Sequence, residues 1–207
     1  MPLGVAILVA AAVVTTSITS CRSGPLHVGI TFENGWSLRN EPLTEVEQSL
    51  VKSIALQTLQ SAFHGFAVQF ELSGSGDRAI RVEDTPYGHY GPGAVVFPFP
   101  PVGTTFPIAK VSSIRLDALY GVELATVQCR AIVDCQSKTR LQLVEGLGRG
   151  LGATAAHELG HQTGLHFSGD AKCDECYDGG SANTLTHFWG TKHWSDQALA
   201  VMRRVLR

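Results

Sequence analysis

Two histidines four residues apart, His157 and His161, constrain this chain more than any other feature of its sequence. On an α-helix this spacing places both imidazoles on the same face, one turn apart, so that both rings can reach one metal ion. Glu158 lies between them, where a carboxylate can hold and deprotonate a metal-bound water. Gly164 follows three residues after the second histidine, and a glycine there can end the helix and turn the chain back toward the metal. The segment therefore predicts a helix that carries a metal site at its C-terminal end.

The third ligand of this site is not fixed by the sequence. A catalytic zinc normally takes three protein ligands and leaves one position for water. His166 would reach the metal if the turn after Gly164 is one residue short. The other candidates are Asp170, because carboxylate oxygens also bind zinc, and a later histidine, either His187 or His193. A site with only two histidines, binding metal weakly or not at all, is the remaining possibility.

The metal-binding segment resembles the metzincin clan of zinc endopeptidases, whose signature is H-E-x-x-H-x-x-G-x-x-H. The chain matches the two histidines, the glutamate and the glycine of this signature, but its last position holds Phe167, which cannot bind zinc, and His166 lies one residue earlier. The resemblance implies an α+β (α/β-like) fold. Its parts would be a twisted, mostly parallel sheet with a backing helix, an active-site helix, and a mostly irregular C-terminal part that ends in a helix.

Metzincins also carry a methionine turn beneath the zinc, before their final helix. By position, residues 183–187 correspond to this turn, with Leu185 where the methionine would be. Leucine has a comparable apolar volume and can pack there with modest loss. His187 stands where some metzincins have a tyrosine that bonds the metal or the oxyanion, so the resemblance gives it that role. The alternative is a partly buried loop histidine, while His193 and Trp194 are expected to act as packing and capping groups.

The whole chain after its first twenty residues predicts one domain. Its 207 residues are 44% hydrophobic and 16% charged, which suits a single globular unit over residues 21–207. The formal net charge of −2 gives no reason to expect nucleic acid or an anionic membrane surface as a partner. We expect a monomer that acts on a peptide or protein substrate.

Residues 1–20 predict a signal peptide. They contain no charged side chain, and the apolar run over residues 5–14 has the length of a signal-peptide core but is short for a membrane-spanning helix. The segment ends in Ile18-Thr19-Ser20-Cys21, which resembles the bacterial lipoprotein box. We therefore expect export, either as a secreted protein or as a cell-envelope lipoprotein attached to the membrane through Cys21. The alternative for Cys21 is an ordinary cysteine beside a conventional cleavage site.

The four remaining cysteines form two close pairs in the sequence, Cys129 with Cys135 and Cys173 with Cys176. An even count at short spacings in an exported chain predicts two small disulfide loops. The second pair has the C-x-x-C spacing of redox motifs and zinc knuckles, but no second C-x-x-C completes a site with four thiolates. A local disulfide after the metal helix is the favoured interpretation.

Periodicity and caps predict the order of the elements. Alternating apolar residues and turn signals predict strands over 26–32, 66–72, 79–82, 94–97 (an edge strand) and 111–116. Cap residues and helical spacing predict helices from Thr44 to about Ala62, over 139–165 and over 195–206. The second helix contains four glycines between residues 146 and 152, which suggests close packing against the sheet or a later start.

The sequence as a whole predicts a zinc-dependent endopeptidase. His157, His161 and a third ligand, His166 by preference, hold Zn²⁺, while Glu158 acts as general base and then general acid. The family resemblance also places the substrate along the edge strand. The rival hypotheses are a catalytically degenerate exported lipoprotein that serves as a binding module, and a zinc hydrolase of non-peptide amides.

Overall fold

The computed structural model describes residues 24–32, 37–38, 41–83, 93–96, 111–115, 137–165, 172–179 and 185–206. Several predictions fall outside these ranges and are not addressed by the structure: the signal peptide, Cys21, the Cys129/Cys135 pair, His166, Phe167 and Asp170. None of the described helices combines the length and the apolar character that crossing a membrane requires.

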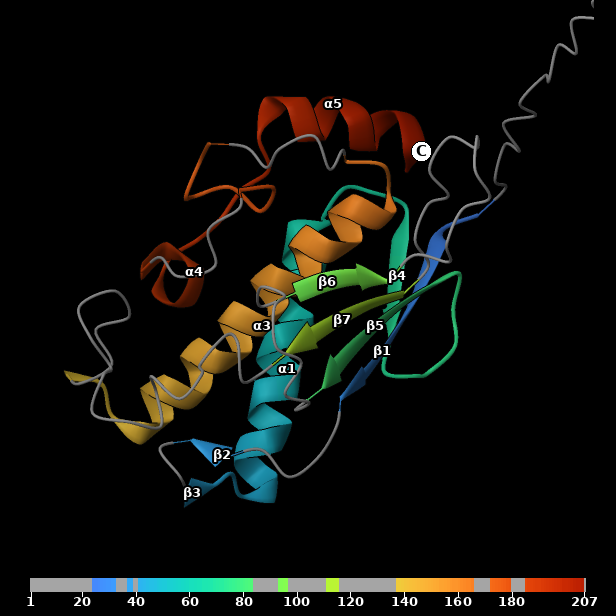
Figure 1. The fold of residues 1–207 in the computed structure, drawn as a ribbon. Helices are drawn as coiled ribbons and strands as arrows, with labels where there is room; N and C mark the ends of the chain where they lie inside the picture. The colour runs from blue at the N-terminus through green and yellow to red at the C-terminus, as the bar shows by residue number, and fades with distance from the viewer. Residues whose placement is uncertain are drawn as a thin grey trace, which may run out of the picture.

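The main sheet has five strands in the order β4-β1-β5-β7-β6 (Figure 1). Strand β1 (Leu26–Phe32) pairs in parallel with β4 (Val68–Glu71) and with β5 (Arg78–Glu83), and β7 (Val111–Arg115) pairs in parallel with β5. Strand β6 (Gly93–Val96) lies antiparallel to β7 at the edge. The prediction of a mixed fold with a mostly parallel sheet is confirmed, as is the predicted edge strand.

The described residues also form four helices and a short hairpin: α1 (Glu45–Ala62), α3 (Arg140–Gln162), α4 (Leu185–Trp189), α5 (Asp196–Val205), β2 (Ser37–Leu38) and β3 (Glu41–Pro42). Helices α1 and α3 run side by side against the sheet (Figure 1). Both start with a capping box, at Thr44 and at Thr139, in which the hydroxyl accepts a backbone N–H and the side chain three residues later returns a bond. Ser195 caps α5. These starts agree with the predicted ones.

The four glycines of α3 let neighbouring helices approach closely. The sequence suggested either packing of these glycines against the sheet or a later start of the helix, and neither is found. Gly148 and Gly152 face α1, and a Cβ on Gly152 would lie 2.6 Å from the carbonyl oxygen of Ala55. Gly146 and Gly150 face α4, where a Cβ would lie 2.5 and 2.6 Å from the rings of its aromatic residues. The glycines reduce intrinsic helix propensity by about 1 kcal/mol each but permit these two close contacts. Helix α3 is thereby buried between α1, α4 and the sheet.

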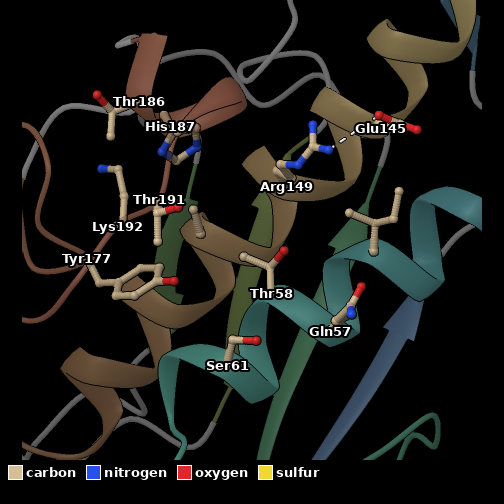
Figure 2. A pocket seen from close by; sticks show the side chains of 13 residues that line it. Gln57, Thr58, Ser61, Glu145, Arg149, Tyr177, Thr186, His187, Thr191 and Lys192 are labelled. Atoms are coloured by element: carbon tan, nitrogen blue, oxygen red, sulfur yellow. Dashed lines mark hydrogen bonds and ion pairs between the residues drawn. The ribbon is translucent and has the colours of Figure 1, made fainter.

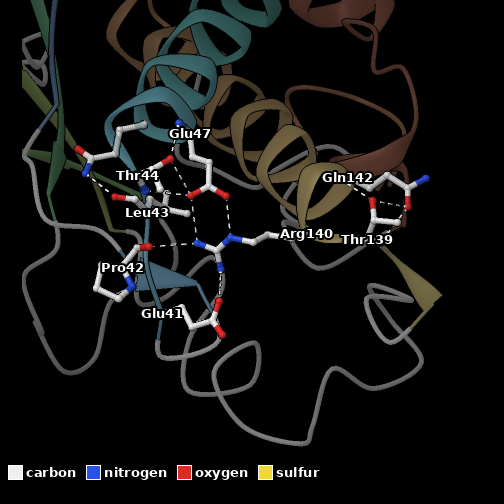
Figure 3. Close-up of polar contacts among 9 residues, drawn as sticks. Glu41, Pro42, Leu43, Thr44, Glu47, Thr139, Arg140 and Gln142 are labelled. Atoms are coloured by element: carbon white, nitrogen blue, oxygen red, sulfur yellow. Dashed lines mark hydrogen bonds and ion pairs between the residues drawn. The ribbon is translucent and has the colours of Figure 1, made fainter.

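Arg140, the first residue of α3, ties the start of this helix to the start of α1 (Figure 3). Its Nε donates to Glu47 at 2.6 Å, its Nη1 donates to Glu41 at 2.8 Å, and its Nη2 donates to the carbonyl oxygen of Pro42. The bond from Arg140, together with the backbone N–H of Thr44, lowers the pKa of Glu47 to about 2. This cluster fixes the relative position of the two helices at the end far from the histidines.

Candidate metal site

The C-terminal end of α3 brings His157 and His161 together. Their Nε2 atoms lie 2.9 Å apart, and the two rings meet edge to face with their centroids 4.4 Å apart. Both side chains are half-buried. In a tetrahedral zinc site with Zn–N bonds of about 2.0–2.1 Å, two ligand nitrogens lie roughly 3.3 Å apart, close to the separation seen here.

The opposite nitrogen of each ring donates to a backbone carbonyl. His157 Nδ1 donates to the oxygen of Tyr177 at 2.8 Å, and His161 Nδ1 donates to the oxygen of Leu165 at 3.2 Å. Because a carbonyl oxygen only accepts, both Nδ1 atoms must carry a proton, and each neutral ring then presents a lone pair at Nε2. A metal ion placed between these two nitrogens could accept both lone pairs. Carbonyl partners of this kind orient the histidines of metal sites.

A glycine turn places the carbonyl that holds His161. Gly164 has a φ of +102°, in the left-handed region, and follows the C-cap Thr163. The N–H of Gly164 donates to His161 O, and the N–H of Leu165 donates to Gly160 O, which is the bonding pattern of a Schellman motif. The predicted role of Gly164 in ending the helix is confirmed. The same turn carries the chain back so that the Leu165 oxygen faces the His161 ring.

The loop over residues 172–179 places the carbonyl that holds His157. A disulfide joins Cys173 to Cys176, as the sequence predicted. The N–H of Tyr177 donates to His193 O at 2.7 Å, which pairs this loop with the segment before α5. The side chain of Asp178 accepts from both the backbone and the hydroxyl of Ser195. The carbonyl of Tyr177 is therefore held between a disulfide and a helix cap.

Glu158 is buried, with 4% of its surface exposed, on the turn of α3 that carries His157. Among the described residues, no third histidine, cysteine or carboxylate joins the two histidines in a cluster that could hold a metal. His166 and Asp170, the first two candidates for the third ligand, lie outside the described residues. The choice of third ligand therefore stays a prediction, as does the alternative of a site with two histidines only.

His187 lies in α4, and not in the turn that the family resemblance predicted from residue 183 onward. Its Nε2 lies 3.2 Å from the hydroxyl of Thr154, and its ring packs edge to face on Phe188. Burial is the main cause that lowers the pKa of His187 to about 3, and the nearby charge of Lys192 adds to the shift. The neutral ring of His187 therefore packs between α4 and α3. It contacts α3 at Thr154, one turn before His157.

The structure also brings together a group of donors that the sequence did not reveal. His193 Nε2 lies 3.7 Å from Cys176 Sγ, and with Cys173 the three side chains place possible ligand atoms within 4.8 Å of one another. No local pattern points to this group, because His193 lies 17 residues after Cys176 in the chain. In the disulfide form neither sulfur is a thiolate, so the group holds the loop in place and does not bind a metal in this state. Trp194, as predicted, is a packing residue: it is buried, and its Nε1 donates to Ala62 O.

Comparisons with known proteins identify the fold. No protein-family model matches the sequence, and no curated protein matches it. Among solved structures, the crystal structure of archaemetzincin from Methanopyrus kandleri is similar, with a TM-score of 0.50 and 12% sequence identity. The similarity covers 89% of this chain and 97% of the archaemetzincin chain. At this identity the comparison shows a shared fold and nothing further.

Proposed function

We propose that this protein is a zinc-dependent endopeptidase. The observation that carries the proposal is the pair of Nε2 atoms of His157 and His161, which face each other at 2.9 Å while both Nδ1 atoms donate to carbonyls. A structural role does not require this arrangement, since two helix histidines in a core could each bond a different neighbour. Two further observations support the proposal: the fold is similar to that of archaemetzincin, and in this chain the pair lies at the end of a long helix beside a sheet with an antiparallel edge strand.

The chain's own residues would divide the work as follows. His157 and His161 hold zinc through Nε2, and His166 completes the set, with Asp170 as the second candidate. Zinc bound there would polarise a peptide carbonyl and lower the pKa of a water molecule. Glu158 accepts a proton from the attacking water and returns it to the leaving amine. Edge strand β6 offers backbone groups along which an extended peptide can add as a further strand.

The test compares the parent protein with a Glu158→Gln variant. The variant should retain zinc, because glutamine leaves both histidines in place, and should lose peptide cleavage by roughly 10²–10⁴-fold. Cleavage is read by mass spectrometry on a mixed peptide library, and zinc by elemental analysis. Glu175→Gln, on an exposed residue of the neighbouring loop, is the matched control and should cleave like the parent.

Two results would contradict the proposal in different ways. Equal cleavage by Glu158→Gln and the parent would refute the acid–base role of Glu158. A parent protein that holds zinc but cleaves no peptide would favour the rival function, an exported binding module with a degenerate site.

Export through the N-terminal segment, with or without lipidation of Cys21, is part of the same proposal. The Cys173–Cys176 disulfide supports it, because disulfides persist mainly in proteins outside the reducing cytosol. Mass spectrometry of the mature N-terminus tests it: a diacylglyceryl-modified Cys21 indicates a lipoprotein, whereas a retained residue 1 contradicts export.

A further inference from the structure

A cavity of about 360 Å³ lies between α1, α3 and the segment that joins α4 to α5. This volume is at the lower end of the range for small-molecule sites. Its wall includes several polar side chains: Thr58 and Ser61 from α1, Arg149 from α3, and Tyr177 and Lys192 from the C-terminal part (Figure 2).

The hydroxyl of Tyr177 points into this cavity. The residue is 7% exposed, and its ring packs against Trp194 at a centroid distance of 5.2 Å. Figure 2 shows the hydroxyl directed toward the wall formed by α1, where Thr58 and Ser61 lie. A phenolic hydroxyl can both donate and accept, so it can bond a polar ligand that occupies the cavity.

The charges of the wall favour an anion. Arg149 reaches the cavity from α3, and its contact with Glu145 uses only Nη2, at 3.3 Å, which is long for a charge-assisted bond. The rest of its guanidinium fork remains available to a second acceptor. Lys192 adds a second positive charge at 8% exposure, held in place by a bond from its Nζ to Cys176 O. The lining thus carries two cations and one carboxylate.

We propose that this cavity is a binding site for a small molecule that carries a carboxylate group. Arg149 receives the carboxylate, the Tyr177 hydroxyl donates to the same group, and the hydroxyls of Thr58 and Ser61 bond the polar remainder of the ligand. The planar carboxylate matches the fork of Arg149, which favours it over a spherical anion. The proposed ligand is held by these side chains alone and needs no metal.

Equilibrium dialysis of the full chain with radiolabelled succinate tests this assignment, with neutral succinamide as the competitor of the same shape. We expect succinate to bind with a dissociation constant at or below about 1 mM and succinamide to compete poorly. Alanyl-alanine and its C-terminal amide, as competitors, show whether a peptide carboxyl terminus or a free carboxylic acid is the better ligand. Binding should persist in the presence of EDTA, so that a failure of the zinc proposal does not affect the result.

Substitutions of the cavity wall complete the test. Arg149→Met should weaken succinate binding by roughly tenfold or more, because it removes a charge-assisted pair. Tyr177→Phe, which keeps the packing on Trp194, should weaken it by roughly two- to tenfold. Lys172→Met, on an exposed lysine outside the cavity, is the control and should bind like the parent. Thermal melts establish that each variant is folded.

Absence of succinate binding up to about 20 mM, well above the dissociation constant expected for a site of this kind, would overturn the proposal. Equal competition by succinamide, or unchanged binding by folded Arg149→Met, would do the same.

Discussion

Replacement of Gly164 by alanine tests whether the turn after α3 controls both the free energy of unfolding and the proposed binding of zinc. Gly164 has a φ of +102°, and a Cβ at this position would meet no atom within 4 Å. The cost of alanine is therefore a backbone cost only. A left-handed conformation is less favourable for an L-residue by about 1–2 kcal/mol. We expect the free energy of unfolding to fall by this amount, which corresponds to roughly 2–8 °C in the melting temperature of a domain of this size.

The effect on zinc follows from the same turn. Strain at residue 164 is relieved if the Schellman turn opens, and opening moves the Leu165 carbonyl away from His161 Nδ1. Loss of such an outer partner typically weakens metal affinity by about 10–100-fold. A zinc affinity lowered by roughly tenfold in Gly164→Ala, measured by competition with a chelating dye, is the expected result.

Gly65 provides a matched control. It also has a positive φ, of +88°, with no atom within 4 Å of a Cβ, but it follows α1 and does not contact the histidines. Gly65→Ala should lose a similar stability and keep the zinc affinity of the parent. If both variants lose zinc equally, the loss reflects general destabilisation, and the role given to the Leu165 carbonyl is wrong. If neither loses stability, the left-handed conformation at these glycines is wrong.

Three further changes have defined outcomes. Gly152→Ala gains about 1 kcal/mol in helix propensity. It also places a Cβ 2.6 Å from the Ala55 oxygen, and overpacking of this kind costs about 1–3 kcal/mol. Urea denaturation should therefore show a net loss near 1 kcal/mol in the free energy of unfolding. The pKa of His187 is lowered to about 3 in the folded protein, below that of a histidine in the unfolded chain. The free energy of unfolding should therefore fall by an amount on the order of 4 kcal/mol as pH falls from about 6.5 toward 3. His187→Phe should flatten this part of the pH profile of unfolding. The pKa of Glu47 is lowered to about 2 by Arg140, so its contribution is present above about pH 4.5 and is lost as pH falls toward 2. Arg140→Met should cost about 1 kcal/mol at pH 7 and less at pH 2, and an equal cost at both pH values would refute the ion pair.

Local signals in the sequence predicted most of the element boundaries. Thr44 and Glu47 form the capping box that the sequence suggested, and Ser195 caps α5. Strand β1 has the predicted bounds, because its alternating residues Val28 and Ile30 are buried in the core. The signal in these cases is contained within a few neighbouring residues, so that no tertiary information is required.

The parts that escaped prediction depend on contacts between distant segments. The glycines of α3 gave no sign of which neighbour they face, and the structure places α1 and α4 there and not the sheet. The carbonyls of Leu165 and Tyr177 hold the histidines, but a backbone group has no sequence signature. The cavity around Tyr177 is formed by three elements that are far apart in the chain. Side-chain types were enough to predict a metal site at the histidine pair, whereas the carbonyls that hold the two rings could be found only from the fold.

The zinc content of the purified full chain, compared with His157→Ala and His161→Ala, tests the central claim most directly. Elemental analysis of the oxidised protein, in which Cys173 and Cys176 are joined, excludes metal bound by their thiolates. The account predicts one tightly held zinc in the parent and none in either variant. A folded parent that binds no zinc in the presence of excess metal would contradict it, as would two variants that each retain the full amount.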